Sequence, residues 1–421
     1  MKQAFSHLYG SEASVIQKQI RRYERILKSF QENFGEKEAA FFSAPGRTEI
    51  GGNHTDHNNG KVLAAGVNVD AVAAAAKSSE NRIVLLSEGY STPFVIDLNR
   101  LDPVIEEKGT ASALIRGIAA RFKTSKYEIG GFQAYVSSDV LPGSGLSSSA
   151  AIEVLIGVIL NEFYNSGQIP PGTLAAIGQF AENVYFGKPC GLMDQMASAV
   201  GGVVAIDFKR PGRPRVRKIA FDLNAFGYSL LIVNTGGSHA DLTRDYASIP
   251  SEMKKLARFF GKETLSEITI EAVYQNIRAL RAAVGDRSIL RALHFFAENA
   301  RVDAQAQALE KGDLQAFLRL ISQSGNSSWK RLQNCSRAGH PEAQGVALAL
   351  ALTEDFIETT GSGACRVHGG GFAGTIQAFL PKKQVRPYKE MIEKTFGKEA
   401  VMNLAIRPAG ALCVGSSEFI G

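Results

Sequence analysis

Apolar side chains recur at helical spacing near the start of the chain and at strand spacing soon afterwards. Between residues 12 and 34 the apolar positions lie mostly three or four residues apart, with Ser11 before them and Gly35 after them. This pattern predicts an amphipathic helix with a serine cap and a glycine stop. Apolar and β-branched runs predict strands at 39–44, 62–76, 82–87, 93–97 and 131–140. A helical pattern at 112–123 falls among them, so this part of the chain is predicted to mix strands and helices.

The rest of the chain is mainly helical in pattern and then returns to strands. Apolar positions after Ser149 predict a long helix, and residues 174–186 predict a second one. Residues 228–237 (YSLLIVNTGG) indicate a buried strand, and 251–330 follow a helical pattern with few prolines. Strand patterns return over the last hundred residues, at 370–380 and near 403–414. Neither an internal repeat nor a low-complexity tract interrupts this order, and the prediction is an α+β fold.

Length and composition fit a globular protein of more than one domain. The chain has 421 residues, and a domain size of roughly 100–200 residues predicts two or three domains. Hydrophobic residues make up 45% and charged residues 21%, a mixture able to bury a large core. The basic stretch KRPGRPRVRK at 209–218 lies between two apolar stretches, so we interpret it as a solvated connector. We place the domain boundary there and predict domains at 1–215 and 216–421.

Charge and cysteine content exclude several functional classes. The net charge is +6, but no aromatic residues interleave the basic ones, which disfavours nucleic-acid binding. The four cysteines show no C-x-x-C spacing, which indicates reduced thiols rather than a zinc site or disulfide framework. The N-terminus lacks the apolar core of a signal peptide, and Asn68 and Asp70 interrupt the longest apolar stretch. We expect a cytoplasmic protein, a monomer or weak oligomer, that binds neither nucleic acid nor membrane.

A glycine- and serine-rich loop, LPGSGLSSSA at 141–150, joins a predicted strand to a predicted helix. Gly143 and Gly145 permit backbone conformations that a β-carbon excludes, and they let a phosphate approach closely. The helix start adds unpaired N–H groups and its positive dipole end, while three serines add hydroxyl donors. The loop is neither a P-loop nor G-x-G-x-x-G. It predicts either a phosphate site or an ordinary strand–turn–helix connection with a serine cap.

Two further stretches gather polar groups or glycines. Residues 44–60 (APGRTEIGGNHTDHNNG) hold many hydrogen-bonding side chains between apolar flanks, which suits a polyhydroxylated ligand. A polar surface loop or a metal site are the alternatives, although H-x-x-H is a weak metal spacing. Residues 367–375 (VHGGGFAGT) predict close approach of backbone to a ligand or to another backbone, or only a tight turn or bulge.

Two acids in the stretch AENVYFGKPCGLMDQMASAVGG, 181–202, are bordered by apolar residues. Glu182 precedes Val184, Tyr185 and Phe186, and Asp194 follows Met193. Partly buried carboxylates require a cationic partner or a metal. The alternative is that one acid caps a helix and the other lies on the surface.

Taken in this order, these stretches resemble the GHMP small-molecule kinases, and galactokinases in particular. Residues 46–60 align without a gap on the galactose-binding signature, LPGSGLSSSA matches the phosphate loop, and CGLMDQMASAVGG matches the stretch with the catalytic aspartate. NTGGSHADLTRDY, 234–246, resembles the sugar-side stretch, and RVHGGGFAGT matches the third motif, with His368 where Thr is usual. The matches run from about Phe30 to Val414. The resemblance implies a two-domain GHMP kinase architecture, with an N-terminal domain like the ribosomal-protein type-2 fold, a C-terminal α+β domain and the active site in the cleft between them.

The resemblance also implies a role for individual residues. Asp194 would accept the proton of the sugar's anomeric hydroxyl, and Arg47 would keep Asp194 ionised and stabilise the transferring phosphoryl group. Ser149 and Glu182 would hold the Mg²⁺ that bridges ATP oxygens. The residues expected to contact ATP are Ser87, Gly143, Ser144, Gly145, Leu146, Ser147, Ser148 and Ser149. Those expected to bind the sugar are Asn53, His54, Thr55, Asp56 and Tyr246.

The departures from the galactokinase pattern concern the sugar. Asn53 replaces a Glu that reaches the hydroxyl on the sugar's sixth carbon (C6), His57 replaces Tyr, and Ile50-Gly51 replaces Leu-Ile. An amide lacks the negative charge that would repel a uronic acid.

From the resemblance as a whole, we expect an ATP-dependent kinase for the C1 hydroxyl of galactose. The alternatives are a C1 kinase for a relative altered at C6, such as galacturonate, and a sugar and ATP sensor without turnover. Mevalonate and homoserine kinases share the phosphate loop but lack the H-T-D box and the M-D-Q stretch in this form.

Overall fold

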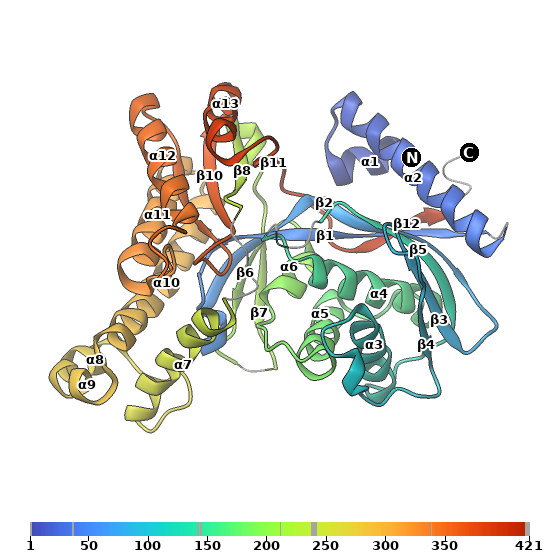
Figure 1. Cartoon of the computed structure of the whole chain (residues 1–421), viewed down its shortest axis with the longest axis horizontal. Helices are drawn as coiled ribbons and strands as arrows, with labels where there is room; N and C mark the ends of the chain where they lie inside the picture. Colours follow the sequence, from blue (N-terminus) through green and yellow to red (C-terminus); the bar gives the residue numbers. More distant parts are fainter. Residues whose placement is uncertain are drawn as a thin grey trace.

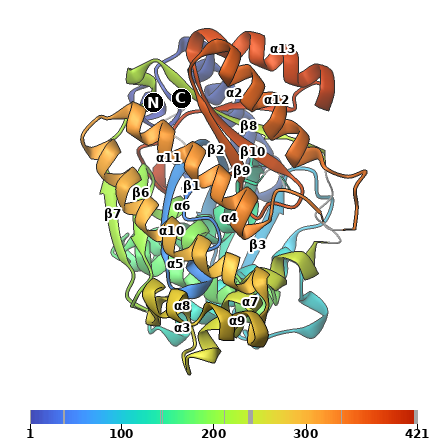
Figure 2. The same ribbon diagram turned by 90° about the vertical axis from the view of Figure 1, so that its left-hand side faces the viewer.

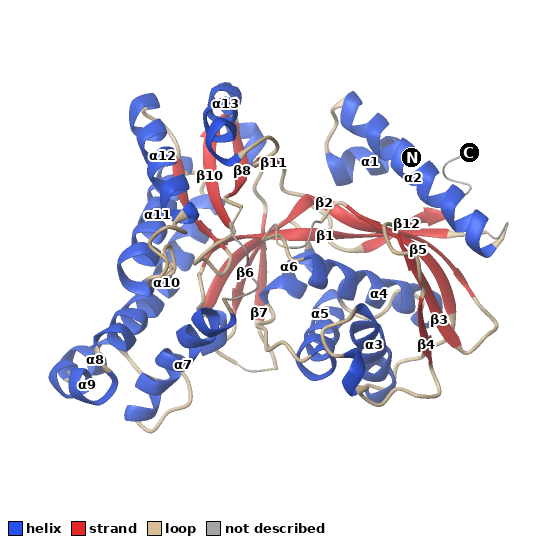
Figure 3. Ribbon diagram, in the orientation of Figure 1, coloured by secondary structure: helices blue, strands red, loops and turns tan. Residues whose placement is uncertain are grey.

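The computed structural model describes residues 2–35, 38–140, 143, 145–210, 212–236, 242–337 and 339–416. Its helices are α1 (Lys2–Tyr9), α2 (Ala13–Phe34), α3 (Ala111–Thr124), α4 (Ser148–Asn165), α5 (Pro171–Phe180), α6 (Met193–Val200), α7 (Thr243–Phe259), α8 (Ile270–Gln275), α9 (Ile277–Val284), α10 (Asp286–Glu310), α11 (Leu314–Ser327), α12 (Gly345–Thr360) and α13 (Val385–Phe396). Its strands are β1 (Ala40–Gly51), β2 (Lys61–Lys77), β3 (Arg82–Ser87), β4 (Phe94–Asp97), β5 (Phe132–Ser138), β6 (Val203–Asp207), β7 (Arg215–Ile219), β8 (Tyr228–Asn234), β9 (Ala364–His368), β10 (Thr375–Pro381), β11 (Val401–Leu404) and β12 (Leu412–Ser416). Figures 1 and 3 show two sheets with helices packed around them, an α+β fold as predicted.

The long antiparallel pair β1–β2 is the centre of an eight-stranded sheet. The strand order is β12-β1-β2-β5-β3-β4, and β6 and β7 extend from β2 at its other end. Residues 71–77 of β2 pair with β5, whereas 61–65 pair with β6. The β1–β2 register shifts between Pro45 and Arg47 and again between Glu49 and Gly51. Such bulges redirect side chains, and these two flank the segment that carries Arg47.

Helices cover both faces of this sheet. Figure 1 shows α3, α4, α5 and α6 on one face and α1 and α2 on the other. The predicted helix over residues 12–34 is α2, which packs on β2 and β5 through its buried residues Tyr23, Ile26 and Phe30. Because both faces are covered, β2 is almost continuously apolar and small, as its run of alanines indicates.

The second sheet has four strands in the order β11-β8-β10-β9. Helices α11, α12 and α13 pack against it, and Figure 2 shows α10 and α11 crossing the end of the β1–β2 hairpin. The sequence pattern predicted strands for this part of the chain but missed α12 and α13. Helix α12 (GVALALALTEDFIETT) is apolar over most of its circumference, so its helical period is hidden in the sequence.

The chain passes between the two sheets more than once. The basic stretch 209–218 was interpreted as a connector, but its second half forms β7, an edge strand paired with β6 with mostly exposed side chains. Near the C-terminus, β12 pairs with β1, and Val67 forms a bridge with Ile406. The last described strand, β12, therefore lies beside β1 in Figure 1. The predicted division at 215/216 falls at the first residue of β7 and stays a prediction.

Candidate active site

An ion pair between β1 and α6 forms the centre of the candidate site. Arg47 donates through Nε to Asp194 Oδ1 at 2.6 Å and through Nη2 to Asp194 Oδ2 at 2.7 Å, a two-point contact. Ser147 also donates to Asp194 Oδ2. Burial raises the pKa of Asp194, but Arg47 and Ser147 outweigh it and hold that pKa below its usual range. Asp194 is therefore a fixed carboxylate at neutral pH, as expected.

The glycine-rich loop lies directly against this pair. The backbone N–H of Arg47 donates to Leu146 O at 3.0 Å, and its guanidinium donates to Gly145 O. Gly143, Gly145 and Ser147 have φ values of 77°, 76° and 58°, a left-handed conformation that glycine adopts without strain. The loop ends where α4 begins, at Ser148, so the unpaired N–H groups of the helix start lie beside Asp194.

The predicted phosphate residues differ in what they can offer a ligand. Ser147, Ser148 and Ser149 are half-buried, whereas the Leu146 side chain is fully buried and leaves only its backbone for a contact. Ser144 lies outside the described residues. Ser87 ends β3, which runs parallel to β5 with Ser87 opposite Val136. Ser87 therefore lies beside the strand that leads into the loop.

A side chain at Gly145 would have little room. A β-carbon there would lie 2.6 Å from Thr375 Oγ1 and 2.9 Å from His368 Nδ1. A left-handed φ also costs a residue with a β-carbon roughly 1–2 kcal/mol. We expect Gly145→Ala to weaken ATP binding about tenfold or more, measured by calorimetry. Gly157→Ala in α4, where the nearest atom would be 3.6 Å away, is the control; equal affinities would contradict this account of the loop.

A second carboxylate, Glu182, lies on the π-helical turn Ala181–Phe186 and is 3% exposed. Its Oε1 accepts hydrogen bonds from Ser149 Oγ at 3.1 Å and from Lys188 Nζ at 3.2 Å. Its Oε2 accepts one from Gln195 Nε2 at 2.9 Å, and that nitrogen also lies 2.9 Å from Glu153 Oε2. The two predicted metal ligands are thus brought together.

This donor set fits Mg²⁺ bound with a nucleotide. Mg²⁺ commonly takes one or two carboxylates and completes its shell with water and substrate phosphates. Ser149 and Glu182 supply one hydroxyl and one carboxylate, while Asp194 is occupied by Arg47. Within the described ranges no cluster of three or more His, Cys, Asp or Glu side chains is arranged to hold a metal without such help.

Three of the predicted sugar residues, Asn53, His54 and Tyr246, contact the glycine run Gly369–Gly371. His54 Nε2 lies 2.9 Å from Gly370 O, and the Tyr246 hydroxyl donates to Gly371 O at 3.2 Å. A β-carbon on Gly370 would lie 2.2 Å from the Tyr246 ring, so the close approach of backbone predicted for this run is to the protein itself. Asp56 is half-buried and accepts a hydrogen bond from its neighbour's backbone at 2.9 Å.

The side chains of Thr55 and Asn53 already form hydrogen bonds with other groups of the protein. The Thr55 hydroxyl is fully buried, 2.8 Å from Gly52 O and 2.6 Å from Lys61 O. Asn53 is also fully buried. Its Nδ2 donates to Glu49 Oε1 at 2.9 Å and Gly369 O at 2.7 Å, while its Oδ1 accepts from Asn334 at 2.8 Å and Ser328 at 3.4 Å. Their direct contact with a sugar stays a prediction.

A carboxyl group lies beside Asn53. Glu49 lies on β1, two residues beyond Arg47, and its Oε1 accepts from Arg366 Nη2 at 2.7 Å as well as from Asn53. Burial raises the pKa of Glu49 above its usual range, although Arg366 and Arg47 oppose that rise. The change from Glu to Asn53 therefore does not leave the region without an acid. Arg366 is already engaged by that acid, which weakens the case for a uronic acid.

We expect His54 to remain neutral across the physiological pH range. Burial, with a contribution from the imidazole of His57, lowers the pKa of His54 to about 3. Nε2 therefore carries the proton and donates to Gly370 O, which leaves Nδ1 as an acceptor. The imidazole resonances of His54, observed by ¹⁵N–¹H correlation NMR, should not titrate between pH 5 and 8; a midpoint near 6.5 would contradict this.

The lowered pKa of His54 also makes the stability of the fold depend on pH. The unfolded imidazole binds a proton below about pH 6.5, whereas the folded one does so only near pH 3. His54 therefore lowers the stability of the fold progressively as the pH falls below 6.5.

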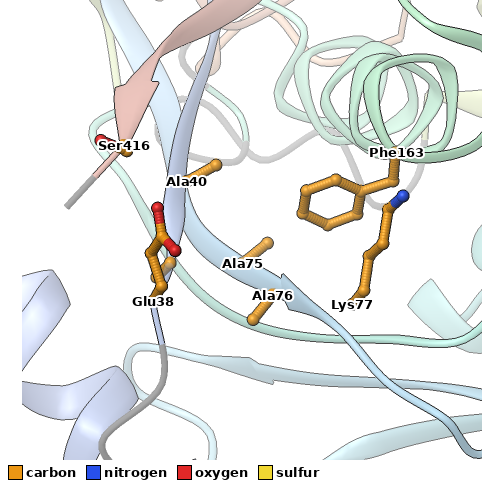
Figure 4. A pocket seen from close by; sticks show the side chains of 8 residues that line it. Glu38, Ala40, Ala75, Ala76, Lys77, Phe163 and Ser416 are labelled. Carbon is orange, nitrogen blue, oxygen red and sulfur yellow. The ribbon is translucent and has the colours of Figure 1, made fainter.

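A hollow of about 540 Å³ lies away from this chemistry. Figure 4 shows it between the start of β1 and the end of β2, with Ala40, Ala75, Lys77 and Phe163 on its walls. Ala40 precedes Arg47 by seven residues of β1, roughly 23 Å at about 3.3 Å per residue. The walls of the hollow are mainly apolar and lie at the end of the sheet. We therefore place the functional site at the ion pair and the glycine-rich loop rather than in the hollow.

Several residues of the site were not singled out from the sequence. Arg366 and Asn334 hold the Asn53 region, and Gln195 holds Glu182. Gln195 directly follows Asp194 and Glu49 lies within the polar stretch 44–60, so both were adjacent to a recognised signal. Arg366 is the first residue of the recognised motif RVHGGGFAGT, but nothing local indicates its partner Glu49. Asn334 carried no local signal, because its partner Asn53 is 281 residues away in sequence.

Comparison with known proteins agrees with this geometry. The model of the N-terminal domain of GHMP kinases matches residues 113–202, and mevalonate kinase from Methanococcus jannaschii shares the fold at 15% identity, with a TM-score of 0.62 over 88% of this chain and 99% of that one. The protein thus has the fold of the GHMP kinases. The galactokinase galactose-binding signature matches residues 28–77, and galactokinase from Streptomyces coelicolor is 30% identical over 377 residues, 88% of this chain and 92% of that protein. Lactococcus lactis galactokinase, solved in complex with galactose, is 25% identical, with a TM-score of 0.77 over 91% of this chain and 97% of that chain.

The chain belongs to the galactokinase family, which confirms the resemblance found in the sequence. The predicted two-domain GHMP kinase architecture is confirmed with it. In the part of the chain that the structure describes, no helix has both the length and the apolar character needed to cross a bilayer.

Proposed function

We propose that this protein transfers the γ-phosphate of ATP to the C1 hydroxyl of galactose. The observation that carries the proposal is the two-point Arg47–Asp194 pair, held against the glycine-rich loop. It combines a fixed carboxylate, a delocalised cation and a set of backbone N–H groups in one place. Phosphoryl transfer is catalysed mainly by positioning and electrostatic stabilisation, which these groups supply.

Asp194 would accept the proton of the sugar hydroxyl. As the hydroxyl oxygen forms its bond to the γ-phosphorus, the bond from that phosphorus to the β–γ bridging oxygen breaks and ADP leaves. Because Arg47 and Ser147 lower the pKa of Asp194, it is a weak base, and the proton would move late, as the attacking oxygen becomes acidic. Arg47 would also offset the negative charge that gathers on the transferring group.

The loop from Gly143 to Ser149 would surround the ATP phosphates, with Ser149 and Glu182 holding Mg²⁺. The bound metal would neutralise phosphate charge during transfer. The protein's own part is orientation: Gln195 fixes one oxygen of Glu182, and Ser149 lies at the other. Ser87 remains a proposed nucleotide contact.

The sugar would lie between Asp194 and the glycine run Gly369–Gly371. His54, Asp56 and Tyr246 are the proposed contacts for its hydroxyls. Arg366 is already paired with Glu49 beside Asn53, so it is not free to hold a uronate, and this favours a neutral sugar. The galactose in the Lactococcus lactis structure supports the same choice.

Product analysis tests the position of transfer. ³¹P and ¹H NMR of the reaction with Mg-ATP and galactose should show one phosphate per ADP released, coupled to the proton on C1. Phosphate on another carbon would contradict the proposed orientation. Tight binding of both ligands without any product would favour the sensor alternative.

A further inference from the structure

Lys188 lies over the carboxylate proposed to hold the metal. The backbone N–H groups of Gly187 and Lys188 both donate to Glu182 O, at 3.0 and 3.1 Å. Gly187 has a φ of 85°, so the chain turns back at the end of the π-helical turn. Lys188 is thereby anchored to Glu182 by its backbone as well as by its side chain.

The ammonium group approaches from solvent and ends at a buried oxygen. The Lys188 side chain is 63% exposed and that of Glu182 is 3% exposed, with 3.2 Å between Nζ and Oε1. Oε1 is also the oxygen that accepts from Ser149 Oγ, the other proposed metal ligand. The second oxygen, Oε2, is held by Gln195 and does not depend on Lys188. The cation therefore lies at the atom where a metal would bind.

The surrounding charges favour a cation at this position. Arg47 is engaged by its two-point contact with Asp194 and is not available to Glu182. Among the ion pairs of the described residues, Lys188 is the cation that pairs with Glu182. A buried carboxylate without a partner would be costly.

We propose that Lys188 is an internal counter-ion of Glu182, which a divalent metal must displace. This inference rests on the proposed function, in which Glu182 and Ser149 hold the metal. An ammonium and a divalent cation on one oxygen would repel each other at about 3 Å. The flexible, exposed stem of Lys188 allows the ammonium to leave for solvent. The lysine would thus keep the site folded before the metal binds and would weaken metal binding.

Binding of Mn²⁺ to the full chain with a non-hydrolysable ATP analogue, at the same analogue concentration for every variant, tests this, followed by electron paramagnetic resonance of the free ion. We expect Lys188→Met to bind Mn²⁺ about threefold more tightly than the unmodified protein, the range expected for loss of a partly exposed pair. Lys188→Arg keeps the charge and should behave as the unmodified protein. Lys108→Met is the matched control, because Lys108 is exposed and close to Gly187 but forms no ion pair with Glu182 among the described residues.

Glu182→Gln separates failure of this inference from failure of the proposed metal site. Loss of Mn²⁺ binding in Glu182→Gln, with tighter binding in Lys188→Met only, supports both. Loss in Glu182→Gln with no change in Lys188→Met overturns the counter-ion role and leaves the metal site standing. Unchanged binding in Glu182→Gln, or no binding to any variant, overturns the metal ligand and the inference that rests on it. Equal tightening in Lys108→Met would show a general charge effect and would also overturn the inference.

Discussion

Replacing Asp194 by Asn is expected to lower kcat by about 10²–10⁴-fold, the contribution typical of a positioned general base. The amide keeps the shape of the carboxylate but cannot accept the proton of the sugar hydroxyl. It also leaves the guanidinium of Arg47 without the charge that it contacts at 2.6 and 2.7 Å. Steady-state kinetics with a coupled assay for ADP measures the loss.

Ligand binding should survive this change, because Asp194 faces the reacting atoms while other groups bind ATP and sugar. Calorimetry should therefore give dissociation constants within a few-fold of the unmodified protein. Asp303→Asn is the matched control: this half-exposed acid pairs with Lys61, outside the ion pair and the loop, and its loss should leave kcat unchanged. Turnover in Asp194→Asn close to that of the control would remove Asp194 from the mechanism.

The largest expected effect on stability is at Asp70, on β2. Asp70 is fully buried and pairs with Arg22 at 2.6 Å and with Arg407 at 2.9 Å, so it joins α2, the central sheet and the segment before β12. Tyr9 and Ser43 donate to the same carboxylate. Asp70→Asn leaves buried Arg407 without its anion and buried Arg22 with only the partly exposed Asp139, and we expect a loss of roughly 3–5 kcal/mol in the free energy of unfolding. Urea denaturation measures it.

Asp139→Asn supplies the comparison for Asp70. Asp139 lies 3.2 Å from the same Arg22, but its side chain is 38% exposed. Exposed pairs are usually worth at most about 1 kcal/mol, so this variant should lose little stability. Similar losses in the two variants would mean that burial does not set the strength of this network.

The sequence predicted those helices and strands in which apolar residues recur with a clear period. The stripe of α2 and the apolar runs of β2 and β3 have bounds within one or two residues of the expected ones. Helix α12 was missed because apolar residues cover most of its surface. The stretch that contains β7 predicts a connector, because Pro and Arg precede the strand and its side chains are largely exposed. An edge strand needs little apolar surface, so its sequence resembles a loop.

The candidate site was predictable where its residues lie in contiguous motifs. Arg47 and Asp194 could each be recognised from their neighbours, although their contact joins positions 147 residues apart. The pairing of Glu49 with Arg366 spans 317 residues, and nothing local to either residue indicates it. The sequence therefore indicated Asn53 as a site residue but could not show that its side-chain amide forms hydrogen bonds with other protein groups.

ADP release with Mg-ATP, measured across a panel of sugars, tests whether this chain is a galactose kinase: galactose, galacturonate, glucuronate, 2-deoxygalactose, N-acetylgalactosamine and glucose. Asp194→Asn serves as the blank. We expect galactose to have the highest kcat/KM, the two uronates to be poor substrates and the blank to turn over far more slowly. A uronate turned over faster than galactose, or no turnover of any sugar although sugar and ATP both bind, would contradict this expectation.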